Sequence, residues 1–305
     1  MSSPAPDQPG WSPFVDDESF DRFWNLVTEH AADRGDIEAD RAGGVIRLDL
    51  GEQEVECGVL NLAQLCAHAP GDEWRGIVAA QFEMLDGPLA FQQVERLIQD
   101  RVLAERHLRL RLAPTPLLEA QNIHRLDLPQ DLSVALAFDV EGSCVYVGRE
   151  RLDRWRAGTN ELLMTGAEQV RKRVRVRSRF RHRFGGRHLH LHGASLFVTG
   201  HLFNLDRHIT GAWGQQGALI TFPTARDMLA IPLDRRTGLI DDITATLATT
   251  AHAFADGPNS LSTDMWWWRP GHDLEPALRL VSGRLKVTAQ GELAWILASA
   301  VDDAA

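Results

Sequence analysis

The spacing of hydrophobic positions divides the 305-residue chain into segments of helical and of strand character. Apolar residues recur at helical spacing over 17–31, 73–84 and 88–103, which predicts three helices in the first third of the chain. Apolar and polar residues alternate over 45–50 and 54–60, which predicts a β-hairpin between the first two helices.

From His107 onward the pattern is mostly of period two, interrupted by helical segments at 159–173 and 239–254. Most neighbouring strands are joined by tight turns, as in antiparallel sheets. The sequence therefore predicts an α+β fold with mixed, largely antiparallel sheets and helices packed on one face. The strands are expected at 107–112, 132–140, 144–148, 219–222, 228–233, 265–268, 278–281 and 293–298.

Proline-containing stretches predict how the chain is organised. Residues 1–16 begin with a segment rich in Pro, Ser and Ala and are expected to form a flexible tail. Three prolines between 113 and 131 indicate a boundary between subdomains. We therefore expect a helix-hairpin-helix subdomain over 17–112 and a C-terminal α+β subdomain over 131–300.

Charge, apolar runs, cysteine positions and glycine motifs limit the partners, the compartment and the cofactors that the sequence predicts. The formal net charge of -10 opposes binding to nucleic acid or to an anionic membrane. No apolar run approaches the roughly 18 residues of a membrane span. Cys57, Cys66 and Cys144 lie far apart in the sequence, which is typical of reduced thiols in a cytoplasmic protein. No glycine-rich phosphate loop occurs, so no cofactor is expected.

The most regular pattern lies between Arg171 and His192. Arginine occupies every odd position from Arg171 to Arg183, and mostly apolar residues occupy the even positions from Val174 to Phe184. A Gly185-Gly186 turn would fold this segment into a hairpin in which Arg183 faces His188. In the same register Arg181 faces His190, Arg179 faces His192 and Phe180 faces Leu191. Opposed residues share a face, so arginine and histidine would gather on one side.

This basic face has two interpretations. It could be the solvated side of a sheet in an arginine-rich protein, or it could attract an anionic small molecule or an acidic protein. The stretch 171–187 carries nine basic residues and no acid. A metal site at the histidines is not expected, because each nearby guanidinium would repel a divalent cation by about 1 kcal/mol or more. The candidate anion-binding residues are Arg175, Arg177, Arg179, Arg181, Arg183, His188, His190 and His192.

A second candidate site follows the hairpin. His201, Asp206, Arg207 and His208 lie close enough in sequence to orient an acid or a base. They could equally belong to an ordinary short helix. The run Trp266-Trp267-Trp268 could stack on a ligand, although packing in the core is the more common use of tryptophan.

Several short motifs follow one another in the C-terminal half. They are Val134-Ala-Leu-Ala-Phe-Asp139 with the segment 152–169, Asn204-Leu-Asp-Arg207, Leu219-Ile-Thr-Phe-Pro223 with Arg226-Asp-Met-Leu229, and Pro258-Asn-Ser-Leu-Ser262. In the order and spacing of these motifs, over about 170 residues, the C-terminal half resembles the YtpQ-like family of uncharacterised bacterial proteins. The resemblance implies a bacterial cytoplasmic protein without an established activity.

Three hypotheses for function remain open from the sequence. The first is a non-enzymatic binding or interaction protein that uses the basic hairpin face. The second is a hydrolase-like or transferase-like enzyme that uses Asp206, Arg207 and a nearby histidine. The third is a structural partner in a larger assembly, which would expose a broad apolar patch, for example around the tryptophan run.

Overall fold

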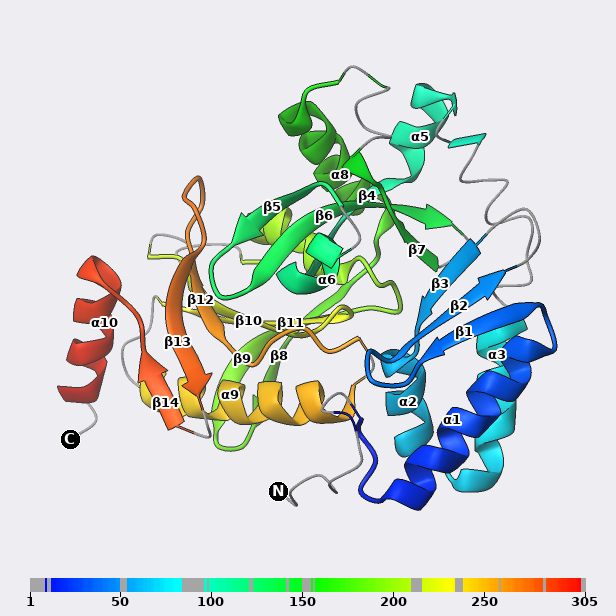
Figure 1. The fold of residues 1–305 in the computed structure, drawn as a ribbon. Coiled ribbons are helices and arrows are strands. Elements are labelled where there is room, and N and C mark those ends of the chain that lie inside the picture. The colour runs from blue at the N-terminus through cyan, green and yellow to red at the C-terminus, as the bar shows by residue number, and fades with distance from the viewer. Residues whose placement is uncertain are drawn as a thin grey trace. The chain divides into compact units, whose positions relative to one another are not determined.

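A computed structural model shows the fold of the chain (Figure 1). Chain contacts separate two compact units, Met1–Phe91 with Asp256–Pro258, and Gln92–Ala255 with Asn259–Ala305. Every strand pair in the described part of the chain is antiparallel, which confirms the α+β fold class. The structure describes residues 9, 12–49, 54–83, 96–97, 99–120, 123–140, 143–149, 155, 157–209, 216–233, 238–257, 259–281 and 284–302.

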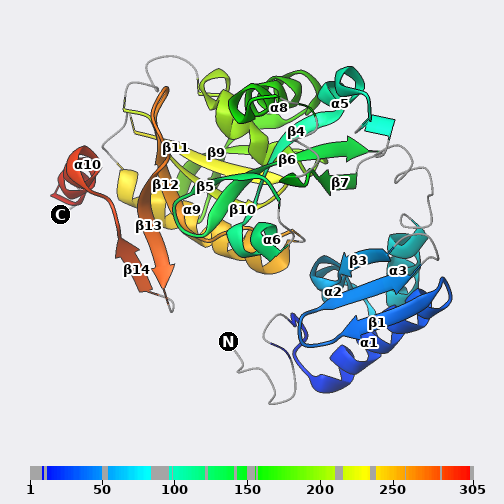
Figure 2. The ribbon, with the colours of Figure 1, turned by 45° about the horizontal axis from the view of Figure 1, so that its top comes forward.

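The first unit packs helices against a three-stranded sheet of order β1-β2-β3 (Figure 2). The expected hairpin is formed by β2 and β3, where Ile46 pairs with Cys57. Phe20 and Phe23 of α1 pack with Ile46 of β2 in a core without solvent exposure. The elements are α1 Asp17–Ala32, β1 Asp36–Asp40, β2 Val45–Asp49, β3 Glu54–Gly58, α2 Leu60–Ala67, η1 Gly71–Glu73 and α3 Trp74–Glu83.

The second unit contains two sheets. A seven-stranded sheet has the order β14-β13-β12-β10-β11-β9-β8, so β8 is an edge strand. In the other sheet β6 pairs with β4, β5 and β7. The strands are β4 Leu108–Pro114, β5 Arg125–Leu128, β6 Leu132–Val140, β7 Ser143–Tyr146, β8 Arg177–Arg183, β9 Gly186–His192, β10 Ala218–Thr224, β11 Asp227–Pro232, β12 Met265–Trp268, β13 Glu275–Val281 and β14 Arg284–Val287.

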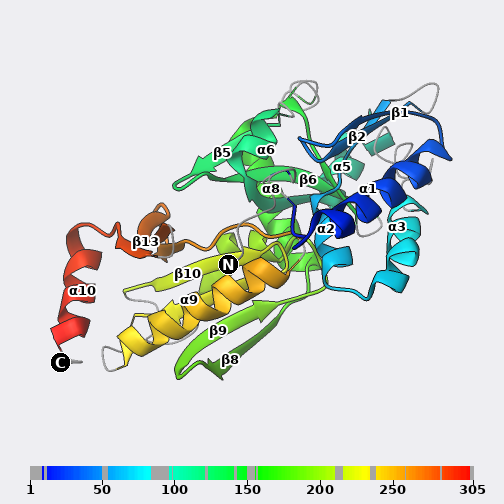
Figure 3. The ribbon, with the colours of Figure 1, turned by 60° about the horizontal axis from the view of Figure 1, so that its bottom comes forward.

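Helices cover the sheets of this unit closely. Figure 3 shows α9 lying along one face of the seven-stranded sheet. Gly166 of α8 lets that helix approach the other sheet, because an added Cβ would lie 3.0 Å from a Leu136 side-chain atom. The helices are α5 Arg101–His107, α6 Thr115–Ala120, α8 Thr159–Arg173, η2 Val198–Arg207, α9 Leu239–Asp256 and α10 Gly291–Asp302. Throughout the described segments, no helix is both long and apolar enough to cross a bilayer.

The tryptophan run belongs to the core. Trp266 and Trp267 are 0% and 2% exposed, and Trp268 is 8% exposed. Their burial in β12 means that this run does not form the exposed apolar patch that a structural partner would require.

Three sequence predictions need correction. The segment 293–298 is part of helix α10, in which Leu293, Ile296 and Leu297 follow helical spacing and are buried. The expected subdomain 17–112 ends too late, since β4 pairs with β6 inside the second unit. The stretch expected as a boundary, 113–131, contains α6 and β5. The helix expected at 88–103 lies largely outside the described residues, as does most of the tail at 1–16.

Candidate functional site

The arginine–histidine hairpin forms as β8 and β9, but its turn lies one residue earlier than predicted. Phe184 and Gly185 occupy the turn with φ angles of 51° and 85°. Positive φ at both central residues is the signature of a type I′ turn, whose twist matches that of the flanking strands. The predicted Gly185-Gly186 turn is therefore wrong, and Gly186 is the first residue of β9.

The earlier turn shifts the register by two residues. Arg181 faces His188, Arg179 faces His190 and Arg177 faces His192. The predicted pairs of Arg183 with His188 and of Phe180 with Leu191 do not form, because Arg183 faces Gly186 and Phe180 faces Leu189. A shift of two residues preserves which side chains share a face. Arginine and histidine therefore still lie on the same face.

Helix α9 explains why Gly186 belongs to the strand. A Cβ on Gly186 would lie 2.5 Å from the Asp241 carbonyl oxygen and 2.6 Å from the Ala245 Cβ. The next residue of β9, Arg187, donates its backbone N–H to Asp242 Oδ1 at 2.6 Å. The start of β9 is thus packed against α9, and only glycine leaves enough space there.

The arginine row is defined as Arg175, Arg177, Arg179, Arg181 and Arg183, all of which are exposed. Arg175 precedes β8, and the other four lie on this edge strand of the sheet. None of these side chains forms an ion pair with a residue that the structure describes. By contrast, Arg171 and Lys172 at the end of α8 both pair with Glu168. Alternate residues of a strand lie about 6.6 Å apart, so the row from Arg177 to Arg183 extends over about 20 Å.

The three histidines of β9 differ in exposure. His188 lies two residues after Gly186 on β9 and is only 1% exposed. Its burial, reinforced by the positive charges of neighbouring His190, Arg183 and Arg181, lowers the pKa of His188 to about 4. The His190 and His192 side chains are 22% and 55% exposed. Only these last two histidines are accessible at the open end of the face.

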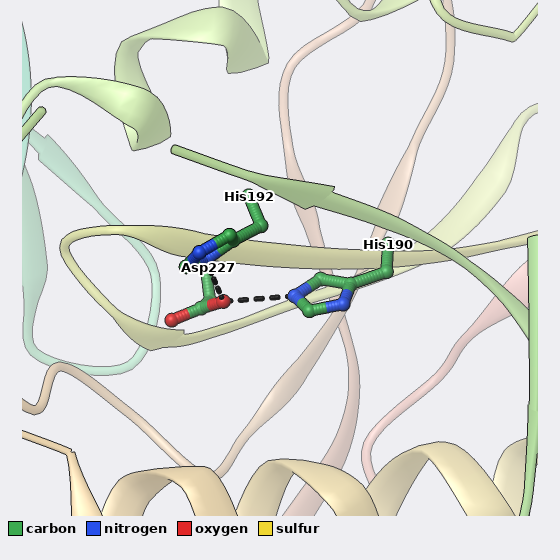
Figure 4. A group of neighbouring side chains, drawn as sticks. All are labelled: His190, His192 and Asp227. Atoms are coloured by element: carbon green, nitrogen blue, oxygen red, sulfur yellow. Dashed lines mark hydrogen bonds and ion pairs between the residues drawn. The ribbon is translucent and has the colours of Figure 1, made fainter. Parts of the chain in front are cut away.

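Asp227 of β11 joins the two accessible histidines in what we call the His–Asp cluster (Figure 4). His190 Nε2 donates to Asp227 Oδ1 at 2.8 Å, and His192 Nδ1 donates to the same oxygen at 2.9 Å. Asp227 lies directly opposite His192 in the β11–β9 pair. His192 in turn faces Arg177, so a basic, an aromatic and an acidic side chain follow one another across three strands.

The surroundings of Asp227 keep its carboxylate ionised. Burial alone would raise the pKa of Asp227, but hydrogen bonds from His190, Thr224 and His192, with the charge of His190, hold it at about 2. Thr224 Oγ1 donates to Asp227 Oδ2 at 2.7 Å. One carboxylate oxygen is therefore held by the threonine, and the other faces both imidazoles.

Asp227 is not among the site residues that the sequence predicts. Its only local signal is an acidic residue at the start of a strand, directly after the turn at 225–226. Nothing in the sequence indicates that β11 pairs with β9, because an entire 3₁₀ segment and β10 separate them along the chain. The cluster forms because the order of strands in the sheet places β11 beside β9.

The second candidate site is only partly assembled. His201 is buried; its Nε2 donates to the Val174 carbonyl oxygen at 3.0 Å, and its Nδ1 lies 3.2 Å from His208 Nε2. Burial lowers the pKa of His201 and, with the neighbouring His201, lowers the pKa of His208 to about 4. Asp206 and Arg207 are exposed, and neither forms an ion pair within the described part of the chain.

Comparisons with protein-family models, with curated proteins and with solved structures find no significant match to this chain. The resemblance to the YtpQ-like family gains no support from them and stays a prediction. The case for function therefore rests on the geometry of the β8–β9 face. This face offers cationic groups in a row, and beside them a carboxylate and two imidazoles that can donate or accept protons and coordinate ions.

Proposed function

We propose that this chain is a binding protein whose arginine row attracts an anionic small molecule or an acidic protein segment. The observation that carries the proposal is the row itself, five exposed arginines that find no carboxylate among the described residues. Like charges at this spacing repel one another, and an anionic ligand would relieve that repulsion. The formal net charge of the whole chain is -10, and the stretch 171–187 carries nine positive charges, so the remaining residues carry a net charge of about -19. This negative charge argues against a nucleic acid as the ligand.

The proposal includes a bacterial cytoplasmic setting. Its supports are the family resemblance and the cysteines, since among the described residues no disulfide joins Cys57, Cys66 and Cys144.

The two other hypotheses have weaker support. The enzyme hypothesis requires a pocket that is lined by Asp206, Arg207 and a histidine. Asp206 and Arg207 are instead exposed, and His201 is hydrogen-bonded to a backbone carbonyl oxygen. A hollow in the first unit, lined by Glu18, Asp21, Arg22 and neighbouring residues, contains none of these groups. For a structural partner, exposed apolar residues occur on α10 and β14, where Trp295 and Val287 are 59% and 58% exposed.

Binding of two defined polyanions tests the proposal. The full chain in metal-free buffer is titrated calorimetrically with inorganic tripolyphosphate and with a hexaglutamate peptide, at low and at moderate salt. The test variant is Arg177→Gln/Arg179→Gln/Arg181→Gln. Its matched control, Arg106→Gln/Arg284→Gln/Lys286→Gln, removes the same charge from exposed positions outside the hairpin.

We expect at least one polyanion to bind, with an affinity that decreases as salt rises. The hairpin variant should bind at least roughly tenfold more weakly, a loss of about 1.4 kcal/mol, and the control should bind like the original chain. Preference for tripolyphosphate would identify a small anion, and preference for the peptide would identify an acidic protein. Equal affinities for the hairpin variant and the original chain, or no binding of either polyanion, would refute the proposal.

A further inference from the structure

We propose that His190 Nε2, His192 Nδ1 and Asp227 Oδ1 form a binding site for a divalent transition-metal ion such as Zn²⁺. One ligand atom from each of the three residues lies within 4.8 Å of the other two, and Asp227 Oδ1 is 2.8 Å from His190 Nε2 and 2.9 Å from His192 Nδ1. Ligands of a tetrahedral zinc ion lie roughly 3.3 Å apart, given bonds of about 2.0–2.1 Å. With the proton of each neutral imidazole moved to its other ring nitrogen, small rotations of the two rings would therefore admit an ion in place of the shared hydrogen bonds.

The ligand types select the class of metal. Two imidazole nitrogens and one carboxylate oxygen suit zinc and its neighbours in the first transition row, whereas calcium and magnesium prefer oxygen alone. Three protein ligands would leave at least one coordination position open to solvent. The cluster therefore has the composition of an open site and not that of a closed structural one.

The sheet holds the three ligands in place. His190 and His192 are two residues apart on β9 and so share a face, and Asp227 lies opposite His192 on β11. Both strands have a neighbouring strand on each side within the seven-stranded sheet. Thr224 Oγ1, which donates to Asp227 Oδ2, fixes the carboxylate so that Oδ1 faces the imidazoles.

Asp227 changes the electrostatic argument against a metal. The expectation of no metal site rested on a face with basic residues alone, and the structure places a carboxylate among them. A divalent ion about 8 Å from an arginine is repelled by about 1 kcal/mol in water. The arginines are exposed and can extend away from the cluster, so this repulsion weakens binding without preventing it.

Metal titration of the full chain tests the site separately from anion binding. The chain is freed of metal by a chelator, dialysed, and titrated with Zn²⁺ by calorimetry and with Co²⁺ by visible absorption. The test variants are His192→Gln and Asp227→Asn. The matched control is His182→Gln, which removes an exposed histidine from the opposite face of β8. Circular dichroism verifies that each variant is folded.

We expect the original chain and His182→Gln to bind one Zn²⁺, and both test variants to bind it at least roughly tenfold more weakly. The triple arginine variant should bind Zn²⁺ at least as tightly as the original chain, which separates this proposal from the anion proposal. The metal site is refuted if the original chain takes up no stoichiometric Zn²⁺, or if the exposed-residue variant His192→Gln retains full affinity.

Discussion

Thr224 and Asp227 form a hydrogen bond of 2.7 Å across the turn between β10 and β11, with the threonine hydroxyl as donor. Thr224 is 3% exposed, and its oxygen also accepts the backbone N–H of Arg226 at 3.1 Å. The turn thus fixes the orientation of the Asp227 carboxylate through Oδ2, the oxygen that does not accept from the imidazoles. This arrangement matches the outer-shell contacts that hold metal ligands in a fixed orientation.

Replacing Thr224 by Val should therefore impair metal binding without touching a ligand. We expect Thr224→Val to lower Zn²⁺ affinity roughly tenfold, because the freed carboxylate can rotate away from the imidazoles. Calorimetric titration measures the effect. Thr224→Ser, which keeps the hydroxyl, should restore the affinity. A loss of thermal stability with unchanged Zn²⁺ affinity would show that the threonine has only a structural role.

The hairpin turn makes a prediction about stability. Phe184 occupies a left-handed conformation that costs an ordinary residue about 1–2 kcal/mol, and Asn-Gly is the preferred pair for a type I′ turn. The Arg183 guanidinium lies 4.9 Å from the Phe184 ring centre, a contact worth about 0.5 kcal/mol when exposed. Phe184→Asn should therefore raise the free energy of unfolding by about 0.5 kcal/mol, as measured by urea denaturation.

Two glycine variants serve as controls for this turn. Gly185→Ala should lower the free energy of unfolding by about 1 kcal/mol, since alanine disfavours a φ of 85°. Gly186→Ala should lower it by about 2 kcal/mol or more, because its Cβ would collide with α9. A destabilised Phe184→Asn would contradict the observed turn, since a turn at 185–186 would leave residue 184 in the strand.

The pair formed by buried His201 and half-buried His208 predicts an acid-sensitive fold. The pKa of His208 falls from 6.5 to about 4 on folding, so below pH 6.5 the unfolded chain binds a proton that the folded chain does not. The stability present above pH 6.5 is therefore lost as the pH falls towards 4. The contribution of His208 amounts to at most about 3 kcal/mol.

Denaturation at a series of pH values measures this loss. His208→Gln, whose amide can still donate to His201 Nδ1, should have a shallower decline in the free energy of unfolding between pH 6.5 and 4. His272→Gln removes an exposed histidine and should behave like the original chain. An unchanged slope in His208→Gln would show that this histidine is not the source of the pH dependence.

Local sequence pattern was sufficient for several elements. The helix predicted at 159–173 and the strand predicted at 265–268 have the bounds of α8 and β12. Both are regular segments, a helix with basic residues in its last turn and a strand of four buried residues. The short segments β1 and α2 went unpredicted, since β1 is mostly exposed and α2 has only eight residues.

The spacing of apolar residues alone gave a wrong prediction near the C-terminus. The apolar run at 293–298 is compatible with either a strand or a helix when it is read over six residues. Ala300 extends the buried set one further helical turn in α10. A longer window would have favoured the helix.

The sequence by itself determined which side chains of each strand share a face, because successive strand residues alternate between faces. Any two-residue turn at either predicted or observed position keeps the arginines and the histidines on the same side, because the two registers differ by two residues. Tertiary structure decided the rest. Packing against α9 leaves space only for glycine at 186, which places this residue in the strand and the turn at 184–185. His188 is buried in the folded sheet, which the sequence did not indicate. The order of strands brings Asp227 beside His190 and His192, and such long-range pairing depends on the packing of the whole sheet and leaves no periodic trace in the sequence.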